Sequence, residues 1–269
     1  MRVSELLRGA NLADREAGLL LLHVLKRERS WLFAHSDAVL ATDVIEQFNS
    51  LVARRGRGIP IAYLVGEREF WSLPLTVSPA VLIPRPDTEL LVMWASAIAR
   101  TEHWQSVLDL GTGSGAIALA LASELPGCVM TAVDNSVAAL GVAKNNGRRL
   151  KLAVEWIQSN WFSALERRQW PLIVSNPPYI RADDPHLTQG DLPSEPVGAL
   201  VGGQDGLECI RAIVHGSLDH LVPNGCLLLE HGYDQADQVR QLMSEVGFSE
   251  VESRCDLAGH ERVTGGRLR

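Results

Sequence analysis

The sequence has 269 residues, of which 46% are hydrophobic and 21% are charged. These proportions exclude a disordered chain and favour one large folded domain or two ordinary ones. With 25 basic and 32 acidic residues the net charge is −7, which argues against a protein that holds duplex nucleic acid mainly by neutralising phosphates.

The four cysteines lie far apart and form no CxxC pair, a pattern typical of free thiols in a reducing cytosol. Segment 1–8 is charged and does not resemble a secretory signal. No apolar run approaches the roughly 20 residues that a bilayer crossing needs. We therefore expect a cytoplasmic protein without membrane contact. The scattered histidines show no metal-site spacing, so we expect no metal.

Residues 1–57 are expected to form a small helical domain. Asn11 is placed to cap its first helix, and Trp31 lies in a second apolar pattern. A third helix is predicted from Thr42 to the basic cluster 54–57, where arginines favour the negative end of a helix. We interpret this cluster as a solvated helix end, although contact with RNA or an acidic partner is the alternative.

Residues 58–86 mix apolar residues with prolines and other turn formers, which predicts an extended or hairpin linker. The remainder, 87–269, begins with a helix near Leu90. From residue 106 onward strands alternate with helices, which predicts α/β architecture with a doubly wound, mostly parallel sheet. The Pro/Gly-rich stretch 183–206 is expected to be a long loop. The expected strands cover residues 107–110, 129–133, 154–157, 172–174 and 227–230. Ser136 is placed to cap the helix that follows the second of them.

A glycine turn, residues 111–115, joins the first of these strands to a helix. Glycine permits a tight turn and a close approach of the backbone to a ligand, and a helix N-terminus attracts negative charge. Asp134 ends the second strand, where a carboxylate can bind two ribose hydroxyls. The pattern predicts a nucleoside cofactor. Ala116 completes a looser spacing that is typical of dinucleotide-binding turns, so NAD is an alternative cofactor. Asp109 disfavours NAD, because a carboxylate suits a cation better than a pyrophosphate.

The tetrad Asn176-Pro177-Pro178-Tyr179 directly follows the fourth strand. A proline holds the residue before it extended, so Asn176 and Pro177 are both restricted. The loop then presents the Asn176 side-chain carbonyl and the Pro177 main-chain carbonyl. Two fixed acceptors suit an NH2 group with its two N–H donors, and Tyr179 offers a flat face to a planar group. A proline-rich turn with a buried tyrosine is the structural alternative.

Together the glycine turn and the tetrad resemble class I S-adenosylmethionine-dependent methyltransferases that act on planar nitrogen atoms. That group modifies adenine amino groups, ribosomal RNA bases or glutamine side-chain amides. Other segments resemble the peptide chain release factor glutamine N5-methyltransferases, so that the resemblance covers nearly the whole chain. These segments are Ile83–Glu89, Glu195-Pro196 with Ala199-Leu200, Gly203 with Asp205-Gly206-Leu207, and Leu229–Gly232.

The resemblance implies a seven-stranded, mostly parallel sheet, a linking β-hairpin and a helical domain 1–57 that recognises the substrate. It implies S-adenosylmethionine as the cofactor, with a catalytic role for Asn176 and Pro177 and substrate binding by residues 176–179. One departure is Asn160, where the family commonly has Asp. The implied cofactor-binding residues are Gly111, Thr112, Gly113, Ser114, Gly115, Asp134, Trp161 and Asn176.

The implied reaction is methylation of the glutamine in the Gly-Gly-Gln motif of class 1 release factors, by a monomer without direct nucleic-acid contact. A nucleic-acid amino methyltransferase is the alternative, and the acidic balance of the larger part disfavours it. An NAD-dependent oxidoreductase leaves the tetrad unexplained, and a silent interaction protein leaves both motifs unexplained. Gly202-Gly203-Gln204 matches the modified tripeptide by coincidence, in our interpretation.

Overall fold

The computed structural model describes residues 1–269 and divides into two compact units. The first unit comprises Met1–Glu67 and Thr188–Ser194, and the second comprises Arg68–Leu187 and Glu195–Arg269. Each unit is built around apolar clusters of its own. None of the helices combines the length and the apolar character that a membrane crossing needs.

The first unit is helical, as expected. Its core is centred on Leu20, Leu21 and Phe48, none of which is exposed to solvent. The amphipathic patterns of the sequence therefore pack against one another, and this burial stabilises short helices that would be marginal in isolation. The helices are α1 (Val3–Gly9), α2 (Asp14–Leu25), α3 (Arg29–Ala34), α4 (Thr42–Arg55) and α5 (Ile61–Val65).

Two local expectations for this unit are wrong. Asn11 does not cap a helix: it takes a left-handed φ of 49°, and α2 begins only at Asp14. Residues 61–65 are helical rather than extended, because proline is tolerated where a helix begins and Leu64 packs into the helical core. The helical unit consequently reaches Glu67 instead of residue 57.

The basic cluster at the end of α4 is not simply solvated. Arg55 pairs with Glu16 (Nη2–Oε1, 2.7 Å) and with Asp191 (Nη1–Oδ1, 2.6 Å). Its side chain is only 19% exposed. Asp191 belongs to Thr188–Ser194, the part of the long loop that joins the helical unit. Arg55 therefore fixes this loop segment onto the helices.

The second unit contains the expected seven-stranded sheet, in the order β5-β4-β3-β6-β7-β9-β8. All neighbours pair in parallel except β9, which is antiparallel to both β7 and β8. A separate two-stranded sheet, β1 (Glu67–Phe70) and β2 (Leu73–Thr76), forms the expected hairpin. The large sheet consists of β3 (Ser106–Leu110), β4 (Val129–Asp134), β5 (Glu155–Gln158), β6 (Trp170–Ser175), β7 (Leu221–Glu230), β8 (Phe248–Cys255) and β9 (Glu261–Leu268).

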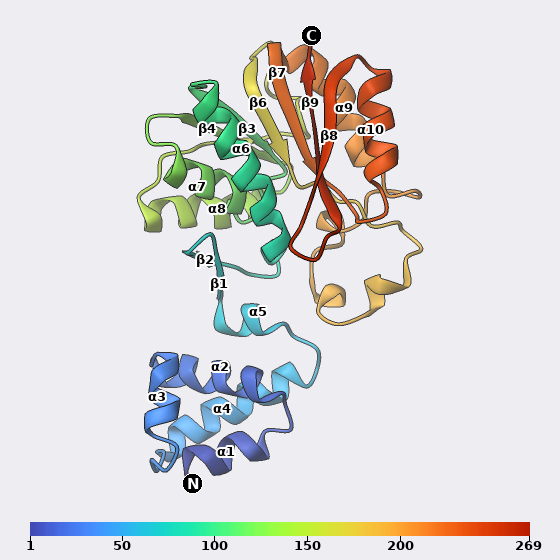
Figure 1. The fold of residues 1–269 in the computed structure, drawn as a ribbon. Coiled ribbons are helices and arrows are strands. Elements are labelled where there is room, and N and C mark those ends of the chain that lie inside the picture. The colour runs from blue at the N-terminus through green and yellow to red at the C-terminus, as the bar shows by residue number, and fades with distance from the viewer. The chain divides into compact units, whose positions relative to one another are not determined.

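Helices cover both faces of the large sheet (Figure 1). Alternate residues of β3 enter different cores: Val107 packs with α6 and α7, whereas Leu108 packs with α9 and α10. This alternation is what a strand buried on both faces requires. The covering helices are α6 (Glu89–Thr101), α7 (Ala116–Glu124), α8 (Val137–Leu150), α9 (Glu208–His220) and α10 (Ala236–Glu245).

A buried amide joins α8 to the hairpin and to the glycine turn. Asn146 Nδ2 donates to the carbonyl oxygens of Thr76 (3.0 Å) and Ser114 (2.9 Å), and its Oδ1 accepts from Thr76 N (2.8 Å). Asn146 is fully buried. Three peptide groups therefore depend on one side chain, and the position of the turn at the carboxyl end of β3 depends on it too.

We expect Asn146→Ala to lower the free energy of unfolding by roughly 2–5 kcal/mol, because each buried peptide group left unpaired costs about 1–3 kcal/mol. The neighbouring Asn145 is exposed on the same helix, so Asn145→Ala should change the stability by less than about 0.5 kcal/mol. Urea denaturation of both variants measures the difference. Equal stabilities for the two variants would contradict the anchoring role.

Candidate functional site

The site lies where the direction of strand succession reverses. From β3 the chain proceeds outward through β4 to β5, and it then returns to place β6 on the other side of β3. In sheets of this kind, ligands bind outside the carboxyl ends of the strands at such a switch point. Leu110 pairs with both Val133 and Ser175, so the glycine turn, Asp134 and Asn176 follow these residues at one edge of the sheet.

A cavity of about 470 Å³ opens at this edge. It brings together residues that the sequence placed in three separate motifs. Residues 80–82 also line it, as do Pro196, Gly198 and Ala199. The side chains of residues 80–82 are apolar, so nothing in the sequence marks them as part of a site. The expected site residues on its wall are Gly111, Gly113, Asp134, Trp161, Asn176 and Pro178.

Five expected site residues do not line this cavity: Thr112, Ser114, Gly115, Pro177 and Tyr179. Thr112 is buried, and its hydroxyl donates to Asp109 Oδ2 (2.6 Å). Ser114 is also buried and is held through its carbonyl by the anchoring amide of α8. Thr112 and Ser114 thus hold the glycine turn in place through contacts within the protein. That they contact a cofactor stays a prediction.

The glycine turn requires its glycines for two reasons. Gly111, Gly113 and Gly115 have φ values of 71°, 57° and 84°, in the region that disfavours other residues. A Cβ at Gly115 would also lie 3.1 Å from both Leu119 and Trp156. On the cavity side the Trp161 ring lies 3.4 Å from the place of a Cβ at Gly111. The missing side chains thus leave the backbone open to a ligand.

Trp161 itself is strained. Its φ is 49°, a value that is rare for an aromatic residue. The Ser159 hydroxyl donates to the Trp161 carbonyl (2.7 Å) and fixes this conformation. Strain of this kind persists only where surrounding structure imposes it, and it gathers at ligand-binding sites. Asn160, the departure noted above, lies on the same cavity wall.

Asp134 is held by backbone donors. Its Oδ2 accepts from Gly113 N (2.9 Å), and its Oδ1 accepts from Ser136 N (2.9 Å). Ser136 in turn caps α8, since its hydroxyl oxygen accepts from Ala139 N (3.2 Å), which confirms the expected cap. Each carboxylate oxygen accepts one bond and retains a further lone pair. A pair of hydroxyls on one ligand matches that arrangement.

Asp109 lies in a different environment. It is 1% exposed, and its Oδ1 has no hydrogen-bond partner. Burial raises the pKa of Asp109 to about 7, against the hydrogen bond from Thr112, which favours the charged form. A cation bound near the glycine turn would stabilise the ionised carboxylate. The orphaned oxygen therefore fits a ligand with a positive charge.

Asn176 presents its amide with a defined polarity. Its Nδ2 donates to Thr88 Oγ1 (3.1 Å), whereas its Oδ1 accepts no hydrogen bond within the protein. Thr88 ends the short 3-10 turn Pro86–Thr88, which belongs to the segment 83–89 noted above. The free carbonyl leaves one acceptor on a residue of the cavity wall, and its contact with a substrate NH2 group stays a prediction.

The Gly202-Gly203-Gln204 tripeptide has a structural explanation. Gly202 N donates to Ile180 O (2.9 Å), and a Cβ on Gly202 would lie only 2.5 Å from the Pro178 carbonyl oxygen. Gly203 has a φ of 94°, and a Cβ there would meet the Glu208 side chain at 2.0 Å. The glycines are therefore needed to pack this loop behind the tetrad.

Two other segments quoted from the sequence are structural at this edge. Glu195 is buried, accepts from Ile83 N (2.9 Å) and pairs with Arg85. It thereby fixes the two segments that carry Leu82 and Pro196, both of which line the cavity. His231 is buried, and burial lowers its pKa. Its Nδ1 lies 2.8 Å from the Gly232 carbonyl oxygen and its Nε2 lies 2.7 Å from Thr264 Oγ1. His231 is therefore a structural histidine and does not line the cavity.

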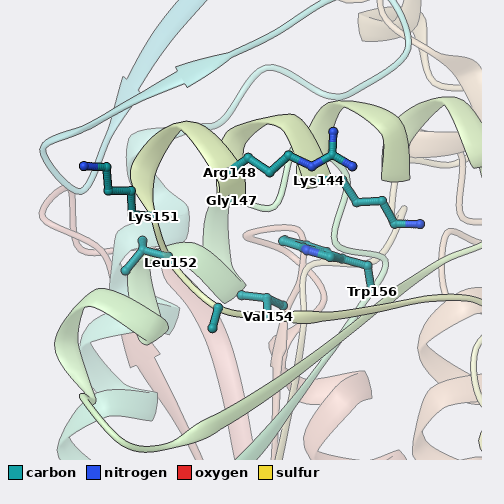
Figure 2. Close-up of a pocket in the computed structure, with 8 residues that line it drawn as sticks. Lys144, Gly147, Arg148, Lys151, Leu152, Val154 and Trp156 are labelled. Atoms are coloured by element: carbon teal, nitrogen blue, oxygen red, sulfur yellow. The ribbon is translucent and has the colours of Figure 1, made fainter.

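A second pocket, of about 430 Å³, lies at the other end of α8. Figure 2 shows Lys144, Arg148 and Lys151 around it, with the Trp156 ring on its wall. Ser136, at the N-terminal end of the helix, lines the candidate site instead. The cationic pocket and the candidate site therefore share no residue.

Comparisons with known proteins find matches to segments in both units of the chain. A family model described as PrmC N-terminal domain matches residues 1–66, and one described as Methyltransferase small domain matches residues 87–189. The "Release factor glutamine methyltransferase" of Xylella fastidiosa (strain Temecula1) is 50% identical over 255 residues, which cover 94% of this chain and 92% of that protein. The protein of the same name from Escherichia coli (strain K12) is 49% identical, with 94% and 91% covered.

The fold also resembles solved methyltransferase structures. A methyltransferase from Pyrococcus furiosus superposes with a TM-score of 0.55 and 18% sequence identity, covering 72% of this chain and 88% of that one. At this identity the likeness concerns the fold alone.

The buried Asp109 predicts a pH dependence of stability. An unfolded aspartate releases its proton near pH 3.9, whereas folded Asp109 keeps it up to about pH 7. The folded state therefore binds more protons between these values, and the free energy of unfolding falls as the pH rises from about 4 through about 7. Asp109→Asn should reduce that fall. Urea denaturation at pH values on either side of this window measures it; an unchanged pH dependence would contradict the burial argument.

Proposed function

The chain belongs to the family of release factor glutamine methyltransferases, and from this premise we propose that it transfers a methyl group from S-adenosylmethionine to N5 of a glutamine side chain. The proposed target is the glutamine in the Gly-Gly-Gln motif of class 1 peptide chain release factors. The observation that carries this proposal is the cavity that joins the glycine turn, Asp134 and the Asn176 carbonyl at one edge of the sheet.

The cavity wall fits S-adenosylmethionine. Asp134 would hold the ribose hydroxyls with the lone pairs that remain on its two oxygens, and Trp161 would lie near the adenine. Asn160 can accept a hydrogen bond from the adenine amine, although without charge. The open backbone at Gly111 and Gly113 suits the methionine part, whose positive charge complements the orphaned Asp109 oxygen. When bound, this cofactor supplies an electrophilic methyl group on a cationic sulfur.

The substrate amide is a poor nucleophile because its nitrogen lone pair is delocalised into its carbonyl. Asn176 Oδ1 and the Pro177 carbonyl would accept its two N–H groups and direct the lone pair toward the methyl carbon. The new carbon–nitrogen bond would form as the methyl carbon left the sulfur, which would keep the bonding electron pair. Positive charge would then grow on the nitrogen, and the two carbonyl dipoles would stabilise it. This is electrostatic preorganisation with the polarity of an oxyanion hole reversed.

The mechanism needs no general base. Once methylated, the nitrogen is positively charged and acidic, so its proton can leave to water after the transfer. Asp134, a carboxylate on the cavity wall, is already engaged by two backbone N–H groups. The chain itself thus binds the two reactants, orients them and stabilises the developing charge. Holding the two reactants in register makes their reaction more effective.

We assign recognition of the release factor to the helical unit, predicted from the sequence as residues 1–57 and extending in the structure to Glu67 with residues 188–194. A monomeric state, a cytoplasmic location and the lack of direct nucleic-acid contact stay predictions. Methylation of a nucleic-acid amino group is the weaker alternative, because the curated relatives are named for release factors and the cationic pocket lies away from the candidate site. Radiolabelled methyl transfer with release factor and DNA offered in parallel separates the two, and mass mapping locates the methyl group.

We predict that Asn176→Ala lowers kcat by roughly 10² or more, by analogy with the loss of one oxyanion-hole donor. The affinity for S-adenosylmethionine should fall much less, because the lost carbonyl is assigned mainly to the substrate amide. Steady-state kinetics and calorimetry measure the two effects, and the exposed Asn145→Ala serves as the matched control. Turnover close to that of the wild type would rule out this mechanism.

We further predict that Asp134→Ala weakens S-adenosylmethionine binding by roughly tenfold or more, since hydrogen bonds to a charged group contribute about 1.5–3 kcal/mol each. Asp134→Asn retains an acceptor oxygen and should weaken binding less. Calorimetry on both variants, with their unfolding free energies as a control, measures this. Unchanged affinity in the alanine variant would remove Asp134 from the ribose role.

A further inference from the structure

Two buried side chains behind the tetrad, Thr88 and Glu230, have no part in the mechanism above. We propose that they are positioning residues: acting through the Thr88 hydroxyl, they hold the Asn176 amide with its NH2 group inward and its carbonyl toward the substrate. This inference rests on the proposed function. It concerns the series Asn176–Thr88–Glu230, called the relay below, in which Asn176 Nδ2 donates to Thr88 Oγ1 and the Thr88 hydroxyl favours the ionised Glu230 carboxylate.

The fold places the three residues together. Ser175 pairs with Leu229 in the parallel register of β6 and β7, so Asn176 and Glu230 lie side by side at the carboxyl ends of these strands. Thr88 reaches them from the end of the 3-10 turn before α6. Thr88 and Glu230 are only 4% and 1% exposed, so solvent does not compete for their polar groups.

The direction of the relay follows from which groups can donate. An ionised carboxylate only accepts, and a hydroxyl has a single hydrogen. The Thr88 hydroxyl acts on the nearby Glu230 carboxylate and lowers its pKa, which favours the charged form. In the proposed relay the Thr88 hydrogen is directed to Glu230, so Thr88 can only accept from Asn176, in agreement with the hydrogen bond from Asn176 Nδ2 to Thr88 Oγ1 (3.1 Å). Asn176 Oδ1 is thereby left to face the cavity.

This polarity decides whether the tetrad can bind a substrate amide. The oxygen and nitrogen ends of an asparagine side chain are nearly equal in size, so packing alone does not distinguish them. A flipped Asn176 would present N–H donors to the N–H donors of the substrate. A protonated Glu230 could donate to Thr88, which would free the Thr88 hydrogen for Asn176 Oδ1 and favour the flipped amide. The ionised form of Glu230 is therefore the competent one.

Tyr179 is coupled to the same carboxylate. Its hydroxyl donates to Glu230 Oε1 at 3.4 Å. Both the side-chain carbonyl of the tetrad and its aromatic ring thus take their orientation from Glu230. The other charged groups that act on Glu230 are Asp87, before Thr88, and Arg262, on β9.

Glu230 is not explained by packing. Its Oε2 has no hydrogen-bond partner that meets ordinary geometry, and a buried, incompletely bonded carboxylate destabilises a fold. Burial raises the pKa of Glu230 to about 7, and the charge of Asp87 adds to this, whereas Thr88, Arg262 and Tyr179 favour ionisation. A glutamine would fill the same space without that cost. The carboxylate is therefore suited to setting the direction of the relay.

The relay predicts a specific pH profile. Because Glu230 must be ionised, kcat of the wild type should rise as the pH increases through about 7 and fall on the acidic side. Glu230→Gln cannot titrate, and its amide can either accept from Thr88 or donate to it. That variant should lose about tenfold in kcat, as expected for one hydrogen bond, and its kcat should lack the step near pH 7.

The experiment compares the wild type, Glu230→Gln, Thr88→Val and Thr88→Ser, with a purified release factor as substrate. We expect Thr88→Val to match Glu230→Gln in kcat, Thr88→Ser to restore wild-type kcat because it keeps the hydroxyl, and KM for S-adenosylmethionine to stay unchanged throughout. The free energy of unfolding of Glu230→Gln at pH 8 should not fall below that of the wild type.

A wild-type pH profile and kcat in Glu230→Gln would overturn the relay alone, as would a failure of Thr88→Ser to restore kcat. A kcat loss in Glu230→Gln that merely follows a loss of folding stability would overturn it as well. If the wild type itself transferred no methyl group to the release factor, the proposed function would fall and the relay with it.

Discussion

The orientation of a single carboxamide, that of Asn176, is the constraint on which the rest of the site depends. The amide of the enzyme and the amide of the substrate are the same chemical group, so one must present its oxygen where the other presents its nitrogen. Prolines fix the backbone on one side, and Gly202 packs against the Pro178 carbonyl with no room for a side chain. On the other side, Thr88 bonds the amide nitrogen. These contacts make the acceptor rigid before any substrate binds.

The carboxylates around the site divide according to how well they are bonded. Asp134 accepts from two backbone donors and is suited to hold neutral hydroxyl groups. Asp109 and Glu230 are buried with one unpartnered oxygen each, and burial raises the pKa of both. Such groups weaken the fold when they ionise. Neither carboxylate lines the cavity: Asp109 belongs to β3, directly before the glycine turn, and Glu230 ends β7. Both therefore lower the stability of segments that support the site.

Much of this arrangement could be predicted from local patterns. The glycine turn, the Ser136 cap and the strand before Asn176 each occupy a few consecutive residues, and parallel strands bring their carboxyl ends to one edge. Contacts between distant segments could not be predicted in this way. Residues 61–65 are helical because Leu64 packs into the helical core. Arg55 pairs with Asp191, which lies in a loop far along the chain. Thr88 and Glu230 belong to segments noted only for their resemblance, and nothing in the sequence shows that both lie behind Asn176.

The most direct test of the account is a crystal structure of this protein with S-adenosylhomocysteine and a class 1 release factor bound. The account predicts that the amide nitrogen of the Gly-Gly-Gln glutamine lies within hydrogen-bonding distance of both Asn176 Oδ1 and the Pro177 carbonyl oxygen, beside the sulfur atom. A glutamine amide bound elsewhere, or one that meets the nitrogen end of the Asn176 side chain, would contradict it.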